Sequence, residues 1–393
     1  MNESKLRKIY DALELTSVFF GVMEKPLFSA FVAYCKAEET DKRGAYAAFV
    51  ANVYEGGGSL TKLVLRLLSE DENVYVKSAA RGEKLPACIE RSAKRELDNF
   101  SAFAALTCAD FAADMGAAES ELPAFDSQVL DMGAAYRKRL RGIEKYGYGI
   151  FSSRGMFRLS DEKEIEPIVS ADKIGMDDFI GYEEERGQVV ANTRAFVEGR
   201  PAANVLLCGD AGTGKSSTVK AVANAFFDEG VRLIELRKDQ LRYLPYVMGK
   251  ISGNPLKFII FIDDLAFNKS DDNFSMLKAA LEGSASAKAA NAVIYATSNR
   301  RHIIKESFSD RDGDDVHRND SLQETLSLSE RFGLVVLFSK PNKDLYLEIV
   351  RELAKKHGLQ TDGKELEVKA EAFALRKGNR SARCAEQFID SLL

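Results

Sequence analysis

The chain has 393 residues, of which 45% are hydrophobic and 29% charged, so it is long enough for two or three domains with ordinary buried cores. Its formal net charge of −5 disfavours a protein that coats nucleic acid, although a local basic patch is compatible with it. Five scattered cysteines and three histidines include no CxxC pair, so the composition suggests neither a disulfide framework nor a zinc site.

The first residues, MNESKLRKIYDALEL, are polar and amphipathic and lack the apolar block of a signal peptide. No run along the chain approaches the roughly 18 apolar residues that are needed to span a bilayer. We therefore predict a soluble, cytoplasmic protein with no membrane partner.

Residues 1–165 are predicted to form a mostly helical N-terminal domain. Apolar residues recur every three or four positions in LRKIYDALELTSVFFGVM, LTKLVLRLLS and AYRKRLRGIEKY. No group of residues here suggests catalysis, so the expected role is accessory or partner-binding. The next segment, YGYGIFSSRGMFRLSDEKEIEPI, contains the turn residues of a hairpin or an extended connector.

An α/β core is predicted over residues 170–340. Short apolar runs at 204–208, 231–236, 258–262, 292–297 and 334–338 alternate with helical segments. This alternation predicts a parallel five-stranded sheet that is covered on both faces. Only helical patterns follow Pro341, so residues 341–393 are predicted to form a small α-helical unit.

The segment NVLLCGDAGTGKSST matches the phosphate-loop motif G-x-x-x-x-G-K-[ST] between a predicted strand and a predicted helix. Its glycines allow backbone N–H groups to surround phosphate oxygens, and the helix N-terminus adds the positive end of its dipole. We expect Lys215 to reach the β- and γ-phosphates and Ser216 to be a ligand of Mg²⁺. The other predicted phosphate-binding residues are Gly209, Asp210, Ala211, Gly212, Thr213, Gly214 and Ser217.

The apolar strand FIIFI ends in two adjacent carboxylates, Asp263 and Asp264. Burying two like charges is costly unless a cation lies opposite them. Asp263 stands where a Walker-B carboxylate that holds Mg²⁺ belongs. Asp264 is placed to polarise a water for attack on the γ-phosphate, or else to cap a helix. Many ATPases of this type have Glu at the second position, and the shorter Asp predicts slow hydrolysis.

The phosphate loop, FIDD, YATSNRR and SERFG occur in this order before the helical C-terminal unit, and together they resemble an AAA+ ATPase. More narrowly, IYATSNRRHII, SLSERFGL and RSARCAEQFID are similar to a family of predicted bacterial AAA+ ATPases of unknown function, over about residues 170–393. The resemblance implies a homo-oligomeric, ring-shaped ATPase in which the C-terminal helices form a lid over the nucleotide.

The resemblance also assigns residues around the water and the γ-phosphate. Asn299 would be the sensor that orients the attacking water, with Thr297 and Ser298 as alternatives. Arg331 would be an arginine finger that enters the neighbouring subunit's site. The alternative for Arg331 is a surface ion pair with Glu324 or Glu330.

The resemblance also assigns the residues of the lid and those that pack around the adenine ring. Arg383 is the preferred lid sensor of bound nucleotide, and Arg380 is the alternative. Ala382 stands between them where the family usually has Gly. Ile180, Gly181 and Tyr182 would pack around adenine.

Three other sequence features give little or no support for a further functional site. SDRDGDDVHRNDS (309–321) is acidic, but Asp315 and Ser321 replace the Gly and Glu of an EF-hand loop, which favours a solvated loop. The basic NRRHIIK (299–305) could contact nucleic acid or a neighbouring subunit, and it is weak support for either. Cys208 is expected to be a buried small apolar residue.

The sequence thus predicts an ATPase that hydrolyses Mg·ATP to drive conformational change or remodelling of an unknown protein partner. One alternative is a nucleotide-gated interaction protein in which hydrolysis is slow or vestigial. Another is a small-molecule P-loop kinase, although no acceptor-binding motif is visible.

Overall fold

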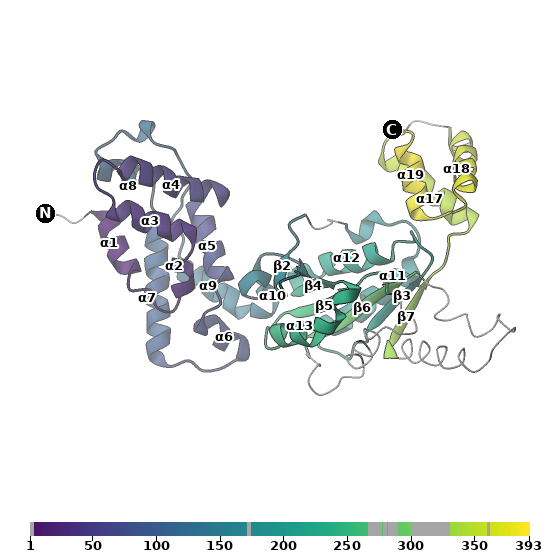
Figure 1. The fold of residues 1–393 in the computed structure, drawn as a ribbon, viewed down its shortest axis with the longest axis horizontal. Helices are drawn as coiled ribbons and strands as arrows, with labels where there is room; N and C mark the ends of the chain where they lie inside the picture. Colours follow the sequence, from purple (N-terminus) through teal and green to yellow (C-terminus); the bar gives the residue numbers. More distant parts are fainter. Residues whose placement is uncertain are drawn as a thin grey trace. The chain divides into compact units, whose positions relative to one another are not determined.

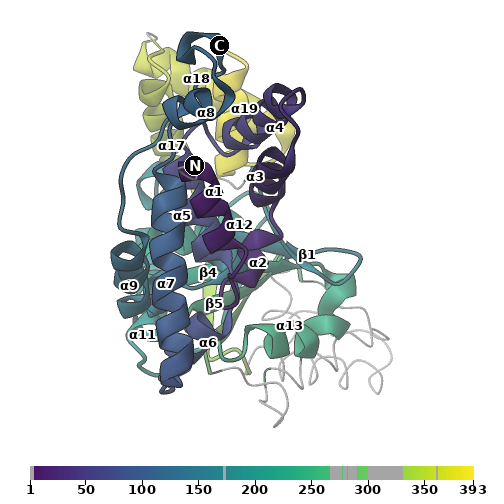
Figure 2. The same cartoon turned by 90° about the vertical axis from the view of Figure 1, so that its left-hand side faces the viewer.

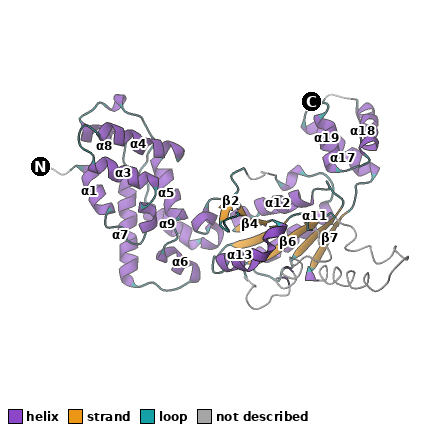
Figure 3. Ribbon diagram, viewed as in Figure 1, coloured by secondary structure: helices purple, strands orange, loops and turns teal. Residues whose placement is uncertain are grey.

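The computed structural model describes residues 4–170, 174–265, 277, 281, 290–299, 331–359 and 362–393. The chain divides into a helical unit, residues 1–153 with 253–255, and a sheet unit, residues 154–252 and 256–393. Within the described residues, strands occur only in the sheet unit (Figure 3). None of the described helices combines the length and the apolar character that crossing a bilayer requires.

The helical unit is built around α7, its longest described helix (Figure 2). Its elements are α1 (Lys5–Leu13), α2 (Phe20–Met23), α3 (Pro26–Lys36), α4 (Lys42–Glu55), α5 (Leu60–Glu70), α6 (Val74–Arg81), α7 (Ala87–Ala104), α8 (Cys108–Met115), η1 (Glu119–Glu121), α9 (Met132–Arg141), α10 (Ile143–Tyr146) and η2 (Gly149–Ser152).

Aromatic side chains fill the core of the helical unit. The rings of Phe31 and Phe103 meet edge to face with their centroids 4.8 Å apart, and those of Phe49 and Phe111 lie 5.1 Å apart. Each such pair contributes about 0.5–1.5 kcal/mol beyond the burial of its area. The unit therefore has a hydrophobic core of its own, as a separate domain requires.

The apolar periodicity of residues 6–23 does not continue as one helix, because the chain leaves helical geometry between α1 and α2. The backbone N–H groups of Ser17, Val18 and Phe19 donate hydrogen bonds of 3.0, 2.9 and 3.0 Å to the carboxylate of Glu96. Glu96 is fully buried on α7. These bonds satisfy N–H groups that a continuous helix would have paired internally, so a contact distant in sequence overrides the local periodicity.

The sheet unit contains a mixed sheet with the strand order β2-β1-β4-β5-β6-β3-β7 (Figure 1). All neighbours are parallel except β2, which runs antiparallel to β1. The strands are β1 (Met156–Leu159), β2 (Ile165–Pro167), β3 (Val205–Gly209), β4 (Val231–Leu236), β5 (Lys257–Ile262), β6 (Ala292–Ser298) and β7 (Leu334–Phe338).

Helices accompany this sheet. α11 and α12 pack through Val189, Val219 and Val222 onto alternate strand residues such as Leu207 and Ile259. The described elements are η3 (Met176–Asp178), α11 (Glu183–Val197), α12 (Lys215–Ala225), η4 (Phe227–Glu229), η5 (Lys238–Tyr243), α13 (Leu244–Ile251), α17 (Lys343–Lys356), α18 (Gly363–Lys377) and α19 (Ala382–Asp390). The last three form a C-terminal bundle with its own core, which includes Tyr346, Val350, Ala370, Ala385 and Phe388.

The prediction of five strands is wrong, because the described part of the sheet has seven. The hairpin β1–β2 comes from the segment predicted to be a hairpin or an extended connector, and β1 pairs in parallel with β4 from Met156 opposite Leu233 onward. Buried Phe157 and Leu159 give this edge an apolar anchor. The helical unit consequently ends before the predicted residue 165.

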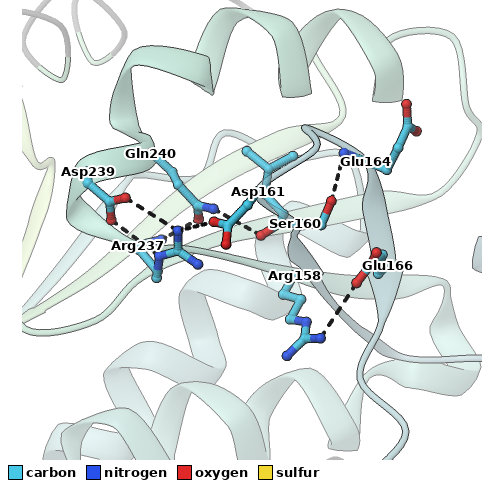
Figure 4. A network of polar contacts seen from close by, with 9 residues as sticks. Arg158, Ser160, Asp161, Glu164, Glu166, Arg237, Asp239 and Gln240 are labelled. Carbon is cyan, nitrogen blue, oxygen red and sulfur yellow. Dashed lines mark hydrogen bonds and ion pairs between the residues drawn. The ribbon is translucent and has the colours of Figure 1, made fainter.

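A polar network fastens the hairpin to the loop after β4 (Figure 4). The Arg237 guanidinium forms an ion pair of 2.5 Å with Asp161 in the hairpin turn. Buried Gln240 donates to the carbonyl oxygen of Leu159 at 3.0 Å and accepts from the N–H of Arg237 at 3.1 Å. Such a network joins side chains distant in sequence, so the local turn residues signal a hairpin but not its place in the sheet.

Candidate nucleotide-binding site

The glycine-rich loop of residues 209–216 leaves β3 and enters α12. Gly209 has a φ of 138°, and a Cβ atom at this position would lie 2.0 Å from the carbonyl oxygen of Phe338 in β7. Only glycine fits here, because a neighbouring strand cannot give way to a side chain at that distance. The loop thus begins where two strand backbones are in close contact.

Two further glycines give the loop its curvature. Gly212 and Gly214 have φ values of 76° and 85°, in the left-handed region that glycine adopts without strain. The Thr213 hydroxyl donates to the carbonyl oxygen of Asp210, and the Asp210 carboxylate accepts from the N–H of Lys340, each at 2.9 Å. Backbone turns of this kind, opening onto a helix N-terminus, form anion-binding cradles.

Lys215 is the first residue of α12 and only 5% exposed. Its ammonium group donates to the carbonyl oxygens of Gly209 at 3.1 Å and Asp210 at 2.7 Å. Burial lowers the pKa of Lys215, and the charge of Asp210 opposes this shift. A buried cation whose hydrogen-bond acceptors are neutral carbonyl groups gains free energy when an anion approaches it.

Ser216 and Asp263 meet in front of the loop. The Ser216 hydroxyl donates to Oδ1 of Asp263 at 2.6 Å, and the Thr297 hydroxyl donates to the same oxygen at 2.5 Å. Hydroxyl and carboxylate oxygens are the hard ligands that Mg²⁺ prefers, and Mg²⁺ completes its shell with water and phosphate oxygens. The donors therefore fit the predicted Mg²⁺ beside a phosphate cradle.

Asp264 is held in an unusual conformation at the end of β5. Its φ is 51°, which is uncommon for a residue other than glycine. Its N–H donates to the Thr297 hydroxyl at 2.9 Å, and its carboxylate accepts from the Asn299 amide at 2.7 Å. Backbone strain of this kind persists where surrounding contacts enforce it, which is common at functional sites.

The strand order explains why these groups converge. β6 lies between β5 and β3, with Ile262 opposite Ala296 and Cys208 opposite Ser298. The carboxyl ends of the three parallel strands therefore reach one edge of the sheet together, where α/β proteins generally bind ligands. Cys208 is buried in β3, in keeping with the apolar role expected from the sequence.

A second wall comes from the residues before α11. Gly181 and Tyr182 both have positive φ values, 71° and 58°. A Cβ at Gly181 would lie 2.4 Å from a methyl group of Leu345, and the Tyr182 hydroxyl donates to the carbonyl oxygen of Ser339 at 2.6 Å. This segment thereby contacts both the connection after β7 and α17 of the C-terminal bundle.

Arg186 supports the same wall. Its guanidinium is buried, donates to the carbonyl oxygen of Gly181 and lies 4.8 Å from the centre of the Phe179 ring. Burial lowers the pKa of Arg186. A buried arginine that bonds to a backbone carbonyl and stacks on an aromatic ring is a rigid support for the chain around it.

The C-terminal bundle approaches the loop through the first turn of α19. The N–H of Arg383 lies 3.4 Å from the carbonyl oxygen of Gly212, and a Cβ at Gly212 would lie 3.0 Å from the Ser381 hydroxyl. Arg383 lines the cleft described below, whereas Arg380 pairs with Glu371 of α18 at 3.1 Å. Of the two predicted sensors, the structure brings Arg383 to the site.

These walls enclose a cleft of about 370 Å³. Ile180 and Tyr182 line it, and Gly181 borders a neighbouring depression instead. The predicted residues that line the cleft are Ala211, Gly212, Thr213, Gly214, Lys215, Ser216, Ser217, Asp263, Asp264, Thr297, Asn299 and Arg383. Most of the predicted site residues, from five separate stretches of sequence, thus surround one cleft.

Arg331 does not line this cleft. It precedes β7, whose first residue, Leu334, pairs with Val205 at the start of β3. Arg331 therefore lies near the amino ends of the strands, whereas the loop lies at their carboxyl ends, about 16 Å away along a strand of this length. Within its own chain it does not meet the loop.

Several cleft residues were not predicted. They are Asp178, Phe179, Arg186, Ile349, Leu353, and Glu386. Burial raises the pKa of the Glu386 carboxyl, as does the charge of Asp390, while Arg383 opposes the shift. Ile349, Leu353 and Glu386 have the helical spacing of ordinary surface and core positions, so the sequence carries no signal for them.

Two interpreted segments lie outside the described residues. These are the acidic stretch 309–321 and all of the basic stretch 299–305 except Asn299.

A strand, a glycine-rich loop and a helix in this geometry define a P-loop α/β domain. A protein family described as "Protein of unknown function (DUF815)" matches residues 153–393, more than half of the chain. The chain therefore belongs to this family, which confirms its predicted resemblance to a family of unknown function. The match begins before residue 170 and includes the hairpin β1–β2.

Among solved structures, the chain is similar to the RuvB Holliday junction branch migration motor of Thermotoga maritima. The sequences are 14% identical, the match covers 56% of this chain and 72% of that chain, and the TM-score is 0.34. A mutant of the same motor matches with 15% identity and the same coverage and TM-score. We infer nothing about function from a likeness this distant. No curated protein matches the chain.

Proposed function

We propose that the protein is an AAA+ ATPase that binds Mg·ATP and hydrolyses it to ADP and phosphate. The observation that carries the proposal is the convergence of Lys215, the Ser216–Asp263 pair and the Asp264–Asn299 pair on one cleft. The loop binds the phosphates, and Lys215 exchanges its carbonyl partners for phosphate oxygens. Ser216 and Asp263 hold Mg²⁺, which neutralises phosphate charge when bound.

Asp264 and Asn299 act on the water. The carboxylate of Asp264 accepts the proton of a water that attacks the γ-phosphate, and Asn299 fixes the direction of that carboxylate. Positioning of this kind is the main contribution that proteins make to phosphoryl transfer. Arg383, at the tip of the C-terminal bundle, contacts the phosphates from the opposite wall.

A second candidate is a nucleotide-gated interaction protein with little turnover. The observation in its favour is that Asp264, already a short side chain, is hydrogen-bonded to Asn299, which limits its freedom to reach a water. In both candidates the nucleotide state is passed to the helical unit, which binds an unidentified protein partner.

ATP binding by the purified full-length chain tests the proposal. Lys215→Ala removes a charge-assisted hydrogen bond, worth about 1.5–3 kcal/mol, and is expected to weaken Mg·ATP binding about 10- to 100-fold in titration calorimetry. Lys364→Ala, on α18 away from the cleft, is the matched control and should bind as the wild type does. A wild-type chain indifferent to ATP refutes the proposal.

Turnover separates the two candidates. Asp264→Asn should retain ATP while phosphate release falls to background, because an amide cannot accept the proton of the water. Undiminished turnover in this variant would remove Asp264 from the role of base. Binding without measurable turnover in the wild type would favour the interaction protein. Proteins captured with Asp264→Asn in the presence of ATP would then identify the partner.

A further inference from the structure

Glu386 is a charged cleft residue to which the proposed reaction gives no task. It lies on α19 and lines the cleft together with Arg383, three residues earlier. Residues three apart share one face of a helix. The two side chains therefore present one positive and one negative charge to the same bound molecule.

The orientation of α19 places these two charges at different distances from the phosphate loop. The helix starts against the phosphate loop, where the N–H of Arg383 faces the carbonyl oxygen of Gly212. Three residues of helix correspond to a rise of about 4.5 Å, so Glu386 lies that much farther along the axis from the loop. A triphosphate bound to the loop would therefore lie nearer to Arg383 than to Glu386, and Glu386 would lie nearer to the rest of the nucleotide.

The other carboxylates that line the cleft are already hydrogen-bonded. Asp178 pairs with Lys356 at 2.7 Å, Asp263 accepts from the Ser216 hydroxyl, and Asp264 accepts from Asn299. Glu386 has no hydrogen-bond or ion-pair partner among the residues that the structure describes. Glu386 is exposed when the cleft is empty, and a ligand that fills the cleft would take its carboxylate out of water. Such a ligand binds best when it brings a hydrogen-bond donor to the carboxylate.

The chemistry of a nucleotide limits which donor this is. A carboxylate repels the phosphates, and the apolar side chains of Phe179, Ile180 and Leu353 in the same cleft suit the faces of a base. Between phosphates and base lies the ribose, whose 2′- and 3′-hydroxyl groups are donors. Acidic side chains recognise ribose hydroxyl groups in other nucleotide-binding folds.

We propose that Glu386 accepts a hydrogen bond from a ribose hydroxyl group and makes the site selective for ribonucleotides over deoxyribonucleotides. This inference rests on the proposed function, since it requires the cleft to hold a nucleotide. Glu386 is a specificity-determining residue and takes no part in the attack on phosphate.

The test compares the affinities of full-length protein for ATP, 2′-deoxy-ATP and 3′-deoxy-ATP, each with Mg²⁺. Wild type should bind ATP about 10-fold or more tightly than at least one deoxy analogue, the loss expected for one hydrogen bond to a charged group. In Glu386→Ala the ATP affinity should fall to that of the disfavoured analogue, so that the ratio of the two approaches one. Glu386→Gln, which keeps the shape and an acceptor oxygen, should give an intermediate ratio.

Glu365→Gln is the matched control. It removes an exposed carboxylate on α18 that does not line the cleft, and it should leave the ratio unchanged. An equal loss for all three nucleotides in Glu386→Ala would overturn the inference, because it would indicate a contact with the base or a structural role. Equal affinities in wild type would overturn it as well.

The failure of this inference differs from the failure of the proposed function. If wild type binds ATP in a Lys215-dependent way but does not discriminate between ribose and deoxyribose, only the inference fails. If wild type binds none of the three nucleotides, the proposed function itself fails.

Discussion

The hydroxyl group of Ser216 donates a 2.6 Å hydrogen bond to the carboxylate of Asp263, which joins the first turn of α12 to the end of β5 across 47 residues of sequence. A metal ion at this point would take both oxygens as ligands. The contact therefore couples the phosphate loop to the strand that carries the paired acids.

Ser216→Ala tests this coupling. Removing one of two protein ligands should raise the Mg²⁺ concentration needed for half-maximal ATP hydrolysis about 10-fold or more, with a smaller effect on metal-free nucleotide binding. A Mg²⁺ titration of turnover provides the measurement. Ser391→Ala, at the end of α19, is the control, and an unchanged Mg²⁺ requirement in Ser216→Ala would argue against a metal at this site.

Asn299→Ala should separate binding from chemistry. Its amide donates to Asp264 at 2.7 Å, so its loss frees the carboxylate without touching the phosphate loop. We expect turnover to fall roughly 10- to 100-fold, while the affinity for Mg·ATP changes less than about 3-fold. Steady-state kinetics and calorimetry on the same samples give the two numbers. A parallel loss of affinity would instead mean that Asn299 contacts the nucleotide.

Arg331 lies at the sheet edge opposite the loop, so any catalytic role for it requires a neighbouring subunit. Arg331→Ala and Lys215→Ala should each be inactive alone, Arg331→Ala by as much as about 10³-fold. Mixing them should restore part of the turnover, because the intact Lys215 of one subunit can meet the intact Arg331 of another. If the two variants assemble together and turnover is still not restored, Arg331 does not act in the neighbouring subunit's site and its role is structural.

Gly209→Ala should prevent the sheet unit from folding. The new Cβ would lie 2.0 Å from the carbonyl oxygen of Phe338, and the φ of 138° is unsuited to alanine. Soluble yield and the thermal midpoint are the readouts. Gly249→Ala is the control, since nothing lies within 4 Å of its Cβ position in α13 and alanine favours a helix by about 1 kcal/mol. A well-folded Gly209→Ala would show that β3 and β7 are less closely apposed.

Asp71→Asn should make the protein more stable at neutral pH. Asp71 is buried in the helical unit, and burial raises its pKa above the usual 3.8, although Asn73 donates to it at 2.8 Å. Because the folded state binds this proton more tightly than the unfolded state does, the stability it contributes is present below pH 3.8 and is lost as pH rises through the raised pKa. Asparagine never ionises, so it avoids that loss.

Urea unfolding at pH 7 and near pH 3.8 measures the effect. The free energy of unfolding of Asp71→Asn should exceed that of wild type at pH 7, and the difference should shrink toward the lower pH. Asp98→Asn, exposed on α7, should change little at either pH. A less stable Asp71→Asn at pH 7 would mean that the hydrogen bond from Asn73 outweighs the cost of burial.

Local chemistry made part of the molecule predictable. The apolar runs at 231–236 and 334–338 coincide with β4 and β7, since buried parallel strands need continuous apolar residues. The loop at 209–216 was recognisable because its turns need glycine at fixed spacing. The hairpin β1–β2 was one of two predicted alternatives for its segment, but its place in the sheet beside β4 and the break between α1 and α2 were not predicted, because Arg237 and Glu96 stabilise them from more than 70 residues away.

The sequence by itself determined the phosphate loop, the paired acids and the alternation of strands and helices, because each depends on residues that are close along the chain. Only the tertiary structure decided that Arg383 rather than Arg380 reaches the cleft, that Arg331 does not, and that Arg186 and Glu386 lie beside the loop. The physical reason is that these outcomes depend on which strands are neighbours and how α19 meets the loop, and such contacts join segments whose local patterns are independent of one another.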